Sequence, residues 1–327
     1  MQVLVTGGAG YVGSHTTRYL LQQGHRVCVY DNLSRGHAQA VPPDVLVVGD
    51  LADTPTLDAL LARFRPEVVM HFAAKAYVGE SVQQPAEYYQ TNLVCTLNLL
   101  EAMRRAGVHR LVFSSTCATY GIPEQLPITE DCPQQPINPY GRSKLAVEWI
   151  LRDYAASYGW GVAILRYFNA AGAAADGTIG EAHDPETHLI PLVIQQALGQ
   201  RPVVELFGTD YPTPDGTCVR DYVHVEDLAS AHALAMLHLE SGRVLAYNLG
   251  MGKGYSVREV IQAVESVSGC SVAVRECKRR PGDPPVLVAS CERITRELGW
   301  RPHYTDLQAV VGSAWRWHST HPKGYRS

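Results

Sequence analysis

The sequence predicts a doubly wound, parallel α/β (Rossmann) sheet followed by a second, smaller α/β lobe. In its first half, short apolar runs alternate with helical stretches of about 10–20 residues, which is typical of βαβ units. A glycine-rich turn directly follows the first apolar run. The strand-like runs lie at residues 3–6, 27–30, 45–48, 68–72, 111–114 and 162–165.

The domain organisation is predicted from chain length and from a change in composition. At 327 residues the chain exceeds what one hydrophobic core usually serves. Gly24 and Gly107 stand where helices of the first half should end. After Phe168 the chain becomes rich in small residues, and residues 208–217 form a second loop-rich stretch. We expect a cofactor domain at 1–169, a second lobe at 170–327, and a strand–helix–strand segment at 223–250 that rejoins the first sheet.

Composition excludes several classes of protein. Hydrophobic residues make up 46% and charged residues 18% of the chain, as in an ordinary globular enzyme. A net charge of −4 argues against nucleic-acid binding. No apolar run approaches a membrane span, and the first strand begins at Met1, so we expect a cytoplasmic protein. The eight cysteines are scattered, so neither disulfides nor a metal site are expected.

The turn at residues 6–13 predicts a dinucleotide site. Gly7, Gly10 and Gly13 permit a tight turn and let backbone amides approach a pyrophosphate at the start of a helix. Asp31 ends the second strand, 18 residues after Gly13, where its carboxylate could bind ribose hydroxyls and repel a 2′-phosphate. The pattern favours NAD, although Arg35 leaves NADP open. Asp50 and Leu51, after the third strand, suit either an adenine contact or a helix cap.

Tyr140 and Lys144 form the candidate site of proton transfer. Asn138 and Pro139 predict the start of a helix, which places the tyrosine and the lysine on one face near its N-terminus. A tyrosine that accepts a proton near pH 7 must lose about three pKa units, or roughly 4 kcal/mol. A nearby lysine, an oxidised nicotinamide and the helix N-terminus together can supply that amount. Thr116, at the carboxyl end of the fifth strand, could hydrogen-bond the reacting oxygen.

Taken together, these residues resemble the extended short-chain dehydrogenase/reductase family, and within it the UDP-glucose (UDP-galactose) 4-epimerases. The resemblance extends over essentially the whole chain. It rests most on residues 4–15, 30–33, 78–81, 118–121, 166–169, 208–213, 219–222 and 321–325.

The resemblance implies an enzyme that retains NAD and inverts C4 of a UDP-hexose through a transient 4-keto sugar. Tyr140 would remove the O4 proton, assisted by Thr116 and Lys144. The cofactor-binding set that it implies is Gly7, Gly10, Tyr11, Val12, Gly13, Asp31, Asn32, Asp50, Leu51, Phe72, Ala73, Asn92, Tyr140 and Lys144. The substrate-binding set is Thr116, Asn169, His188, Leu189, Arg220, Arg280, Asp283 and Leu287. A homodimer through helices at about 86–106 and 139–158 is also implied.

Two departures from the family pattern concern the cofactor and the sugar. Some members carry a cofactor-contacting lysine at the position of Ala76, and Lys75, one place away, is not expected to replace it. Some members carry a tyrosine at the position of Leu287, so the smaller leucine predicts tolerance of UDP-N-acetylhexosamines.

Other functions stay open on the same fold. Epimerases of UDP-glucuronate or of UDP-pentoses differ only in detail of the pocket. A nucleotide-sugar 4,6-dehydratase usually has an Asp-Glu pair after the strand-five threonine, where this chain has Cys117 and Ala118. A non-catalytic NAD sensor would usually lack the tyrosine or the lysine, and both are present here.

Overall fold

The computed structural model describes residues 1–280 and 282–326. The strands are β1 (Gln2–Thr6), β2 (Arg26–Asp31), β3 (Leu46–Val48), β4 (Val68–His71), β5 (Arg110–Thr116), β6 (Gly161–Tyr167), β7 (Asn169–Ala171), β8 (Val204–Phe207), β9 (Val219–His224), β10 (Val244–Leu249), β11 (Gly254–Ser256), β12 (Val274–Cys277) and β13 (Val286–Leu287).

The α-helices are α1 (Tyr11–Gln22), α2 (Thr54–Phe64), α3 (Val78–Gln83), α4 (Pro85–Tyr89), α5 (Cys95–Arg105), α6 (Pro139–Tyr158), α7 (Leu189–Ala197), α8 (Val225–Leu237), α9 (Val257–Ser268), α10 (Glu292–Leu298) and α11 (Leu307–Thr320). Two short 3-10 turns, η1 (Ala38–Ala40) and η3 (Cys117–Thr119), and a π-helical turn, η2 (Gln90–Val94), complete the pattern. No described helix combines the length and the apolar character that crossing a membrane requires.

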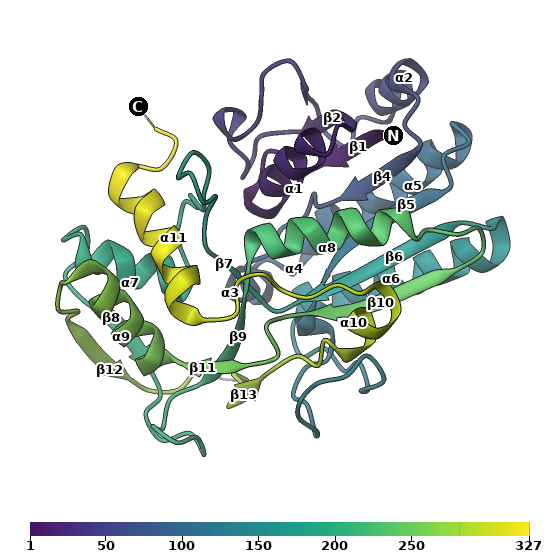
Figure 1. Cartoon of the computed structure of the whole chain (residues 1–327). Coiled ribbons are helices and arrows are strands. Elements are labelled where there is room, and N and C mark those ends of the chain that lie inside the picture. Colours follow the sequence, from purple (N-terminus) through teal and green to yellow (C-terminus); the bar gives the residue numbers. More distant parts are fainter. Residues whose placement is uncertain (281, 327) are drawn as a thin grey trace.

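A seven-stranded parallel sheet in the order β10-β6-β5-β4-β1-β2-β3 forms the middle of the larger part of the molecule (Figure 1). All six strands expected in the first half are present, which confirms the predicted fold class. The order reverses direction between β1 and β4, the point at which open α/β sheets bind ligands beyond the carboxyl ends of their strands. The loops after β1 and β4 therefore meet at the expected site.

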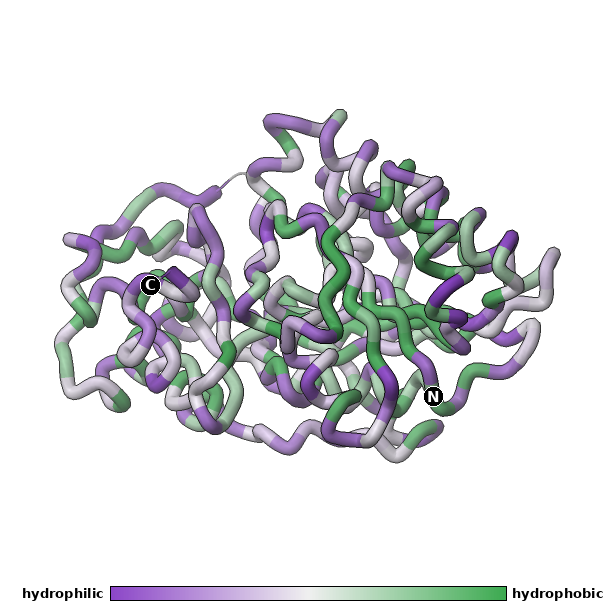
Figure 2. The backbone as a smooth tube through the Cα atoms, turned by 90° about the horizontal axis from the view of Figure 1, so that it is seen from above, coloured by the Kyte–Doolittle hydropathy of each residue, from purple (hydrophilic) through white to green (hydrophobic). Residues whose placement is uncertain are grey.

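Helices cover both faces of this sheet because successive side chains of each strand point to opposite sides. Val3 and Val5 belong to a core on the side of α1 and α8, whereas Leu4 belongs to a core that includes residues of α2, α5 and α6. Figure 2 shows the apolar strands running side by side through the middle of the larger part of the molecule. The strands are buried on both faces, which is why they read as continuous apolar runs.

The segment 223–250 divides between two sheets. β10 pairs in parallel with β6 at the edge of the large sheet, and α8 packs against α1. β9 instead lies in the smaller sheet, where it pairs with β7, β11 and β13. A separate core that includes residues of α7, α9 and α11 lies on that side. Leu287 of β13 and Cys117, which directly follows β5, pack against the same small apolar cluster.

Candidate active site

The glycine-rich loop between β1 and α1 packs against the loop after β4. Gly7 has a φ of +71°, and a Cβ there would lie 2.4 Å from the backbone nitrogen of Ala73. A Cβ on Gly13 would lie 2.2 Å from the carbonyl oxygen of Gly7. Neither position can accept a side chain without a backbone shift, so the loop keeps its amides free to approach a ligand. Val12 lies in the first turn of α1 with Tyr11, whose hydroxyl donates to Gly172 O at 2.6 Å.

Asp31 lies at the end of β2, as predicted, and holds the same loop. Its carboxylate accepts from the backbone N–H of Ala9 and from that of Leu33, each at 2.9 Å. Burial raises the pKa of Asp31, and these backbone donors oppose that shift. Arg35, which left NADP open, donates instead to Glu80 at 2.9 Å. A carboxylate at this point and an arginine already paired favour a ribose with a free 2′-hydroxyl.

The residues expected on the adenine side lie beside Asp31. The Nδ2 of Asn32 donates to the carboxylate of Asp50 at 2.7 Å, and that carboxylate also accepts from the backbone of Ala52 at 2.8 Å. Leu51 is buried in the core beneath α2 and α5. The alternative that Asp50 caps the following helix is wrong, because Asp53 caps α2 by accepting from the backbone N–H of Thr56 at 3.2 Å. The contact of Asp50 with adenine stays a prediction.

Asn92, in the π-helical turn, supports the loop after β4. Its side-chain oxygen accepts from the backbone N–H of Lys75 at 2.8 Å, and its amide donates to Lys75 O at 2.9 Å. The side chain of Lys75 pairs with Glu87. Phe72, which precedes Ala73, packs its ring against that of His232 with centroids 4.8 Å apart. The loop is thus fixed by Asn92, and Lys75 is engaged elsewhere.

The structure brings Tyr140, Lys144 and Thr116 together. α6 begins at Pro139, and the side chain of Asn138 caps it by accepting from the backbone N–H of Gly141 at 2.8 Å. Lys144 is buried, and its Nζ donates to the carbonyl oxygen of Ser114 at 2.9 Å. The side chain of Thr116, at the end of β5, lies close enough to Tyr140 to lower the pKa of its phenol. A hydroxyl, a phenol and an ammonium therefore share one buried site.

Burial shifts both titratable groups of this set toward their neutral forms. It raises the pKa of Tyr140, a shift that the nearby side chain of Thr116 opposes. It lowers the pKa of Lys144 to about 7, with the carboxylate of Glu148 acting against the shift. A low-dielectric site penalises each charge alone and strengthens the attraction between opposite charges. The geometry therefore suits a phenolate that forms only in company with positive charge.

Supporting residues beneath this site were not foreseen from the sequence. Arg166 and Glu148 form a fully buried ion pair with an N···O distance of 2.6 Å. Glu148 also accepts from the hydroxyl of Ser115 at 2.5 Å, and Arg166 donates to that of Tyr120 at 2.8 Å. The spacing of Glu148, four residues after Lys144, is the one signal that could have indicated it.

Several of the residues expected to bind the substrate lie in or near the smaller sheet. Arg220 on β9 pairs with Asp283, and Leu287 on β13 lies beside Arg220 in the parallel register. The guanidinium of Arg280 lies 4.0 Å from the centroid of the Phe207 ring. Burial raises the pKa of Cys117 to about 12, and the positive charge of Arg220 opposes this shift. The arginine therefore lies near the end of β5, close to the proton-transfer set.

Three other expected substrate residues occupy element starts on the same side. Asn169 opens β7, which pairs with β9. His188 is the N-cap of α7, and Leu189 is its first residue. The side chain of His188 pairs with Glu181, so its backbone remains the part that could face a substrate.

Comparisons with known proteins show similarity over nearly the whole chain. The model of the "NAD dependent epimerase/dehydratase family" matches residues 3–250. A UDP-glucose 4-epimerase of Halalkalibacterium halodurans is 51% identical over 326 residues, covering 99% of this chain and 98% of the relative. The crystal structure of UDP-glucose 4-epimerase from Brucella ovis in complex with NAD superposes with a TM-score of 0.93 at 51% identity, covering 95% of this chain and 96% of that one. The UDP-Glc/GlcNAc 4-epimerase of Campylobacter jejuni has a TM-score of 0.84 at 42% identity, with 98% and 99% coverage.

Proposed function

The chain belongs to the NAD dependent epimerase/dehydratase family, and we propose that it acts as an NAD-dependent 4-epimerase of a UDP-hexose. UDP-glucose and UDP-galactose are its expected pair of substrates, as the names of its full-length relatives indicate. The observation that carries the proposal is the meeting of Tyr140, Lys144 and Thr116 at the carboxyl end of β5, beside the sheet's point of reversal.

The chain's own residues fit NAD. The glycine-rich loop leaves room for a pyrophosphate at the start of α1, since a Cβ at Gly7 or Gly13 would strike backbone. In this proposal Asp31 accepts from the ribose hydroxyls, and Asn32, Asp50 and Leu51 contact the adenine side. When bound, NAD supplies the acceptor and donor of the C4 hydride and, in its oxidised form, a positive ring beside the phenol.

Tyr140 acts as the base that takes the O4 proton, and Thr116 shares that hydrogen bond. Lys144 lies one helical turn away, where side chains are about 5–6 Å apart. At an effective dielectric of 20 an ammonium at that distance stabilises a phenolate by roughly 3 kcal/mol. The hydrogen bond from Lys144 to Ser114 O fixes the position of that charge. After the 4-keto sugar has rotated to present its other face, the same tyrosine returns the proton to O4.

The UDP moiety is held at the far end by charged residues. Arg220 and Arg280 offer forked donors that match phosphate oxygens, and Asp283 can accept two hydroxyls of the uridine ribose. Asn169 and the backbone of His188 and Leu189 line the same side. Anchoring the nucleotide leaves the sugar free to rotate about its link to the diphosphate, which inversion of C4 requires.

Leu287 is expected to widen the range of sugars. It lies on β13 next to Arg220, where some family members carry a tyrosine. A leucine leaves more room beside the sugar, so we extend the proposal to UDP-N-acetylhexosamines. The similarity to an enzyme named a UDP-Glc/GlcNAc 4-epimerase supports this extension.

We also propose a homodimer. α5 and α6 lie on one side of the sheet. Large apolar side chains are exposed on α6, Trp149 by 60% and Tyr158 by 51%, and at the end of η2, directly before α5, Val94 by 40%. Association of two copies through these helices would remove that apolar surface from water. The cytoplasmic location expected from the sequence stays a prediction.

The test is turnover without added cofactor. Purified protein incubated with UDP-galactose alone should form UDP-glucose until the two reach equilibrium, and denatured protein should release NAD. If the purified protein turns over only while NAD is added to the assay, the proposal that it retains its cofactor is contradicted. Formation of a UDP-sugar product that has lost one molecule of water would indicate a dehydratase instead.

A further inference from the structure

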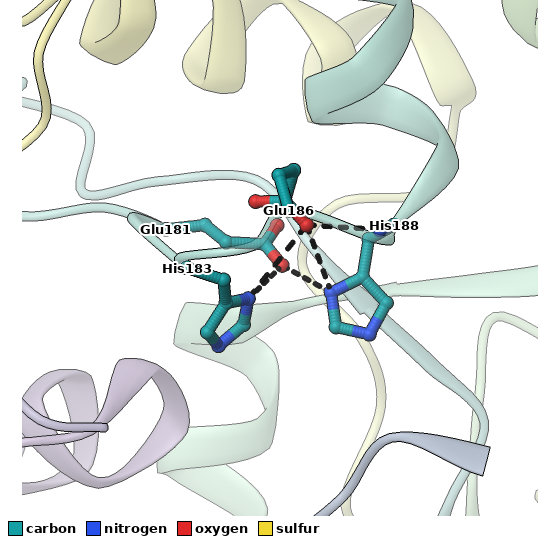
Figure 3. Close-up of side chains that lie close together, drawn as sticks. All are labelled: Glu181, His183, Glu186 and His188. Atoms are coloured by element: carbon teal, nitrogen blue, oxygen red, sulfur yellow. Dashed lines mark hydrogen bonds and ion pairs between the residues drawn. The ribbon is translucent and has the colours of Figure 1, made fainter. Parts of the chain in front are cut away.

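Four side chains outside the proton-transfer set converge on one point in the segment that precedes α7. They are Glu181, His183, Glu186 and His188, and their nearest ligand atoms all lie within 4.8 Å of one another. Figure 3 shows the two imidazoles facing the two carboxylates from opposite sides. Among the described residues, no other group of three or more His, Cys, Asp or Glu side chains could hold a metal ion in this way.

Three of the four distances between the histidine nitrogens and the glutamate oxygens suit a shared ion, and the fourth joins His188 directly to Glu181 in a short hydrogen bond. His183 Nδ1 lies 3.0 Å from Glu181 Oε1 and 3.8 Å from Glu186 Oε1, and His188 Nδ1 lies 3.6 Å from Glu186 Oε1. In a tetrahedral site with bonds of about 2.0–2.2 Å, ligand atoms are separated by about 3.3–3.6 Å. Both histidines present the same atom, Nδ1, to the centre.

One atom of the cluster points to a ligand independently. His183 Nδ1 is buried and, among the described residues, makes no hydrogen bond of acceptable geometry despite its closeness to Glu181. A buried nitrogen of this kind needs a partner. A metal ion at the centre would accept its lone pair, whereas an imidazolium there would need an acceptor in line with its N–H.

The charge of the cluster requires compensation. The side chains of Glu181 and Glu186 are only 4% and 5% exposed. Two buried carboxylates so close together are costly unless positive charge accompanies them. A divalent cation with two neutral imidazoles balances them, and so do two imidazoliums. The cation is favoured because His183 Nδ1 makes no hydrogen bond to the described residues.

The surroundings hold this segment rigidly. Trp317 Nε1 donates to Glu181 O at 3.0 Å, and His37 Nε2 lies 2.6 Å from Ala182 O. The rings of Tyr11 and Tyr77 stand edge-on to His183, at centroid distances of 6.2 and 5.6 Å. The cluster thus lies between the glycine-rich loop and the start of α7.

We propose that Glu181, His183, Glu186 and His188 form a structural site for a zinc-class divalent cation. Imidazole and carboxylate ligands suit zinc, and four protein ligands leave no open position for chemistry. The ion would fix the segment between β7 and α7, which contacts Tyr11 in the first turn of α1. The scattered cysteines indicated no metal site. The pattern that indicates one is Glu-x-His-x-x-Glu-x-His at residues 181–188, which contains no cysteine.

The experiment measures metal content and does not depend on the proposed activity. Full-length protein is stripped with chelator, exposed to zinc ion, exchanged into metal-free buffer and analysed by mass spectrometry of the metal. Wild type should retain about one zinc per chain and show a melting temperature higher by about 5 °C with excess zinc. His183→Ala/His188→Ala should retain less than about one tenth of that zinc. Glu186→Gln, which keeps the shape of the side chain, should bind more weakly and serves if the double variant fails to fold.

His238→Ala is the matched control, because this histidine is exposed at the end of α8. It should bind zinc as wild type does. Cobalt(II) in wild type should give tetrahedral visible bands without thiolate charge-transfer absorption, which separates this site from the eight free cysteines. Wild type that takes up no zinc, or equal uptake by the double variant, overturns the proposal and leaves an imidazolium–carboxylate network.

Discussion

Lys144 Nζ on α6 donates a hydrogen bond of 2.9 Å to the carbonyl oxygen of Ser114 on β5. This contact joins the helix that carries Tyr140 to the strand that ends at Thr116. It therefore fixes the distance between the three groups as well as the direction of the lysine's charge. Beneath it, the buried pair of Arg166 and Glu148 ties β6 to the same helix.

Replacing Tyr140 by phenylalanine should remove the base and leave the fold intact. The phenol is buried and its ring packs near that of Tyr88, so the variant keeps the apolar contacts. We expect turnover of UDP-galactose to fall by about 10²–10⁴, as is typical of lost acid–base catalysis. Tyr158→Phe, an exposed change on the same helix, should retain wild-type turnover. Unchanged activity in Tyr140→Phe would show that another group is the base.

The stability of the protein should depend on pH through Lys144. Burial lowers its pKa to about 7 in the folded state, whereas an unfolded chain has the ordinary value of about 10.4. Between these values the unfolded state binds more protons, so stability rises with pH; below about pH 7 both states carry the proton and the contribution is flat. Relative to Lys144→Met, the free energy of unfolding of wild type should rise by about 2 kcal/mol from pH 7 to pH 9. If the free energies of unfolding of the two proteins, measured with denaturant at each pH, change equally between pH 7 and pH 9, the lowered pKa of Lys144 is contradicted.

An alanine at Gly13 should prevent retention of NAD. Its Cβ would lie 2.2 Å from Gly7 O, so the loop must open where the pyrophosphate is expected. NAD released on denaturation, measured by absorbance, should fall well below one per chain. Gly312→Ala on α11 is the control, because a Cβ there meets nothing within 4 Å. It should retain NAD and gain up to about 1 kcal/mol of stability. Equal NAD content in both variants would place the cofactor elsewhere.

Loss of Arg166 should destabilise the fold strongly. Arg166→Met leaves Glu148 as a buried, uncompensated carboxylate, which typically costs about 3–5 kcal/mol. Adding Glu148→Gln should recover part of that loss. Arg104→Ala, which breaks an exposed pair with Glu101 on α5, should cost less than about 1 kcal/mol in the same urea titration. A loss for Arg166→Met no greater than for Arg104→Ala would refute the ion pair's role.

Leu287→Tyr should narrow the range of sugars. The larger side chain beside Arg220 is expected to reduce kcat/KM for UDP-N-acetylgalactosamine by at least tenfold and to leave UDP-galactose within about threefold. Val286→Leu, at the neighbouring position of β13, is a size control. If wild type epimerises UDP-galactose but not UDP-N-acetylgalactosamine, the predicted tolerance of N-acetylated sugars is wrong.

Sequence patterns determined the family and the fold class, and they predicted the sites of chemistry along the chain. The strand runs, the glycine spacing and the Tyr140–Lys144 pair act over short distances, where periodicity and turn geometry dictate structure, and the full-length relatives confirm the family. The division at residue 169 and the ligand roles of the individual site residues stay predictions.

Only the tertiary structure decided which distant residues meet. It paired Arg35 with Glu80 and Arg220 with Asp283, placed Glu148 against Arg166, and divided 223–250 between two sheets. It also turned Glu181, His183, Glu186 and His188 toward one point. A side chain's partner and pKa depend on burial and on groups brought close by packing across the chain, and one-dimensional spacing carries neither quantity.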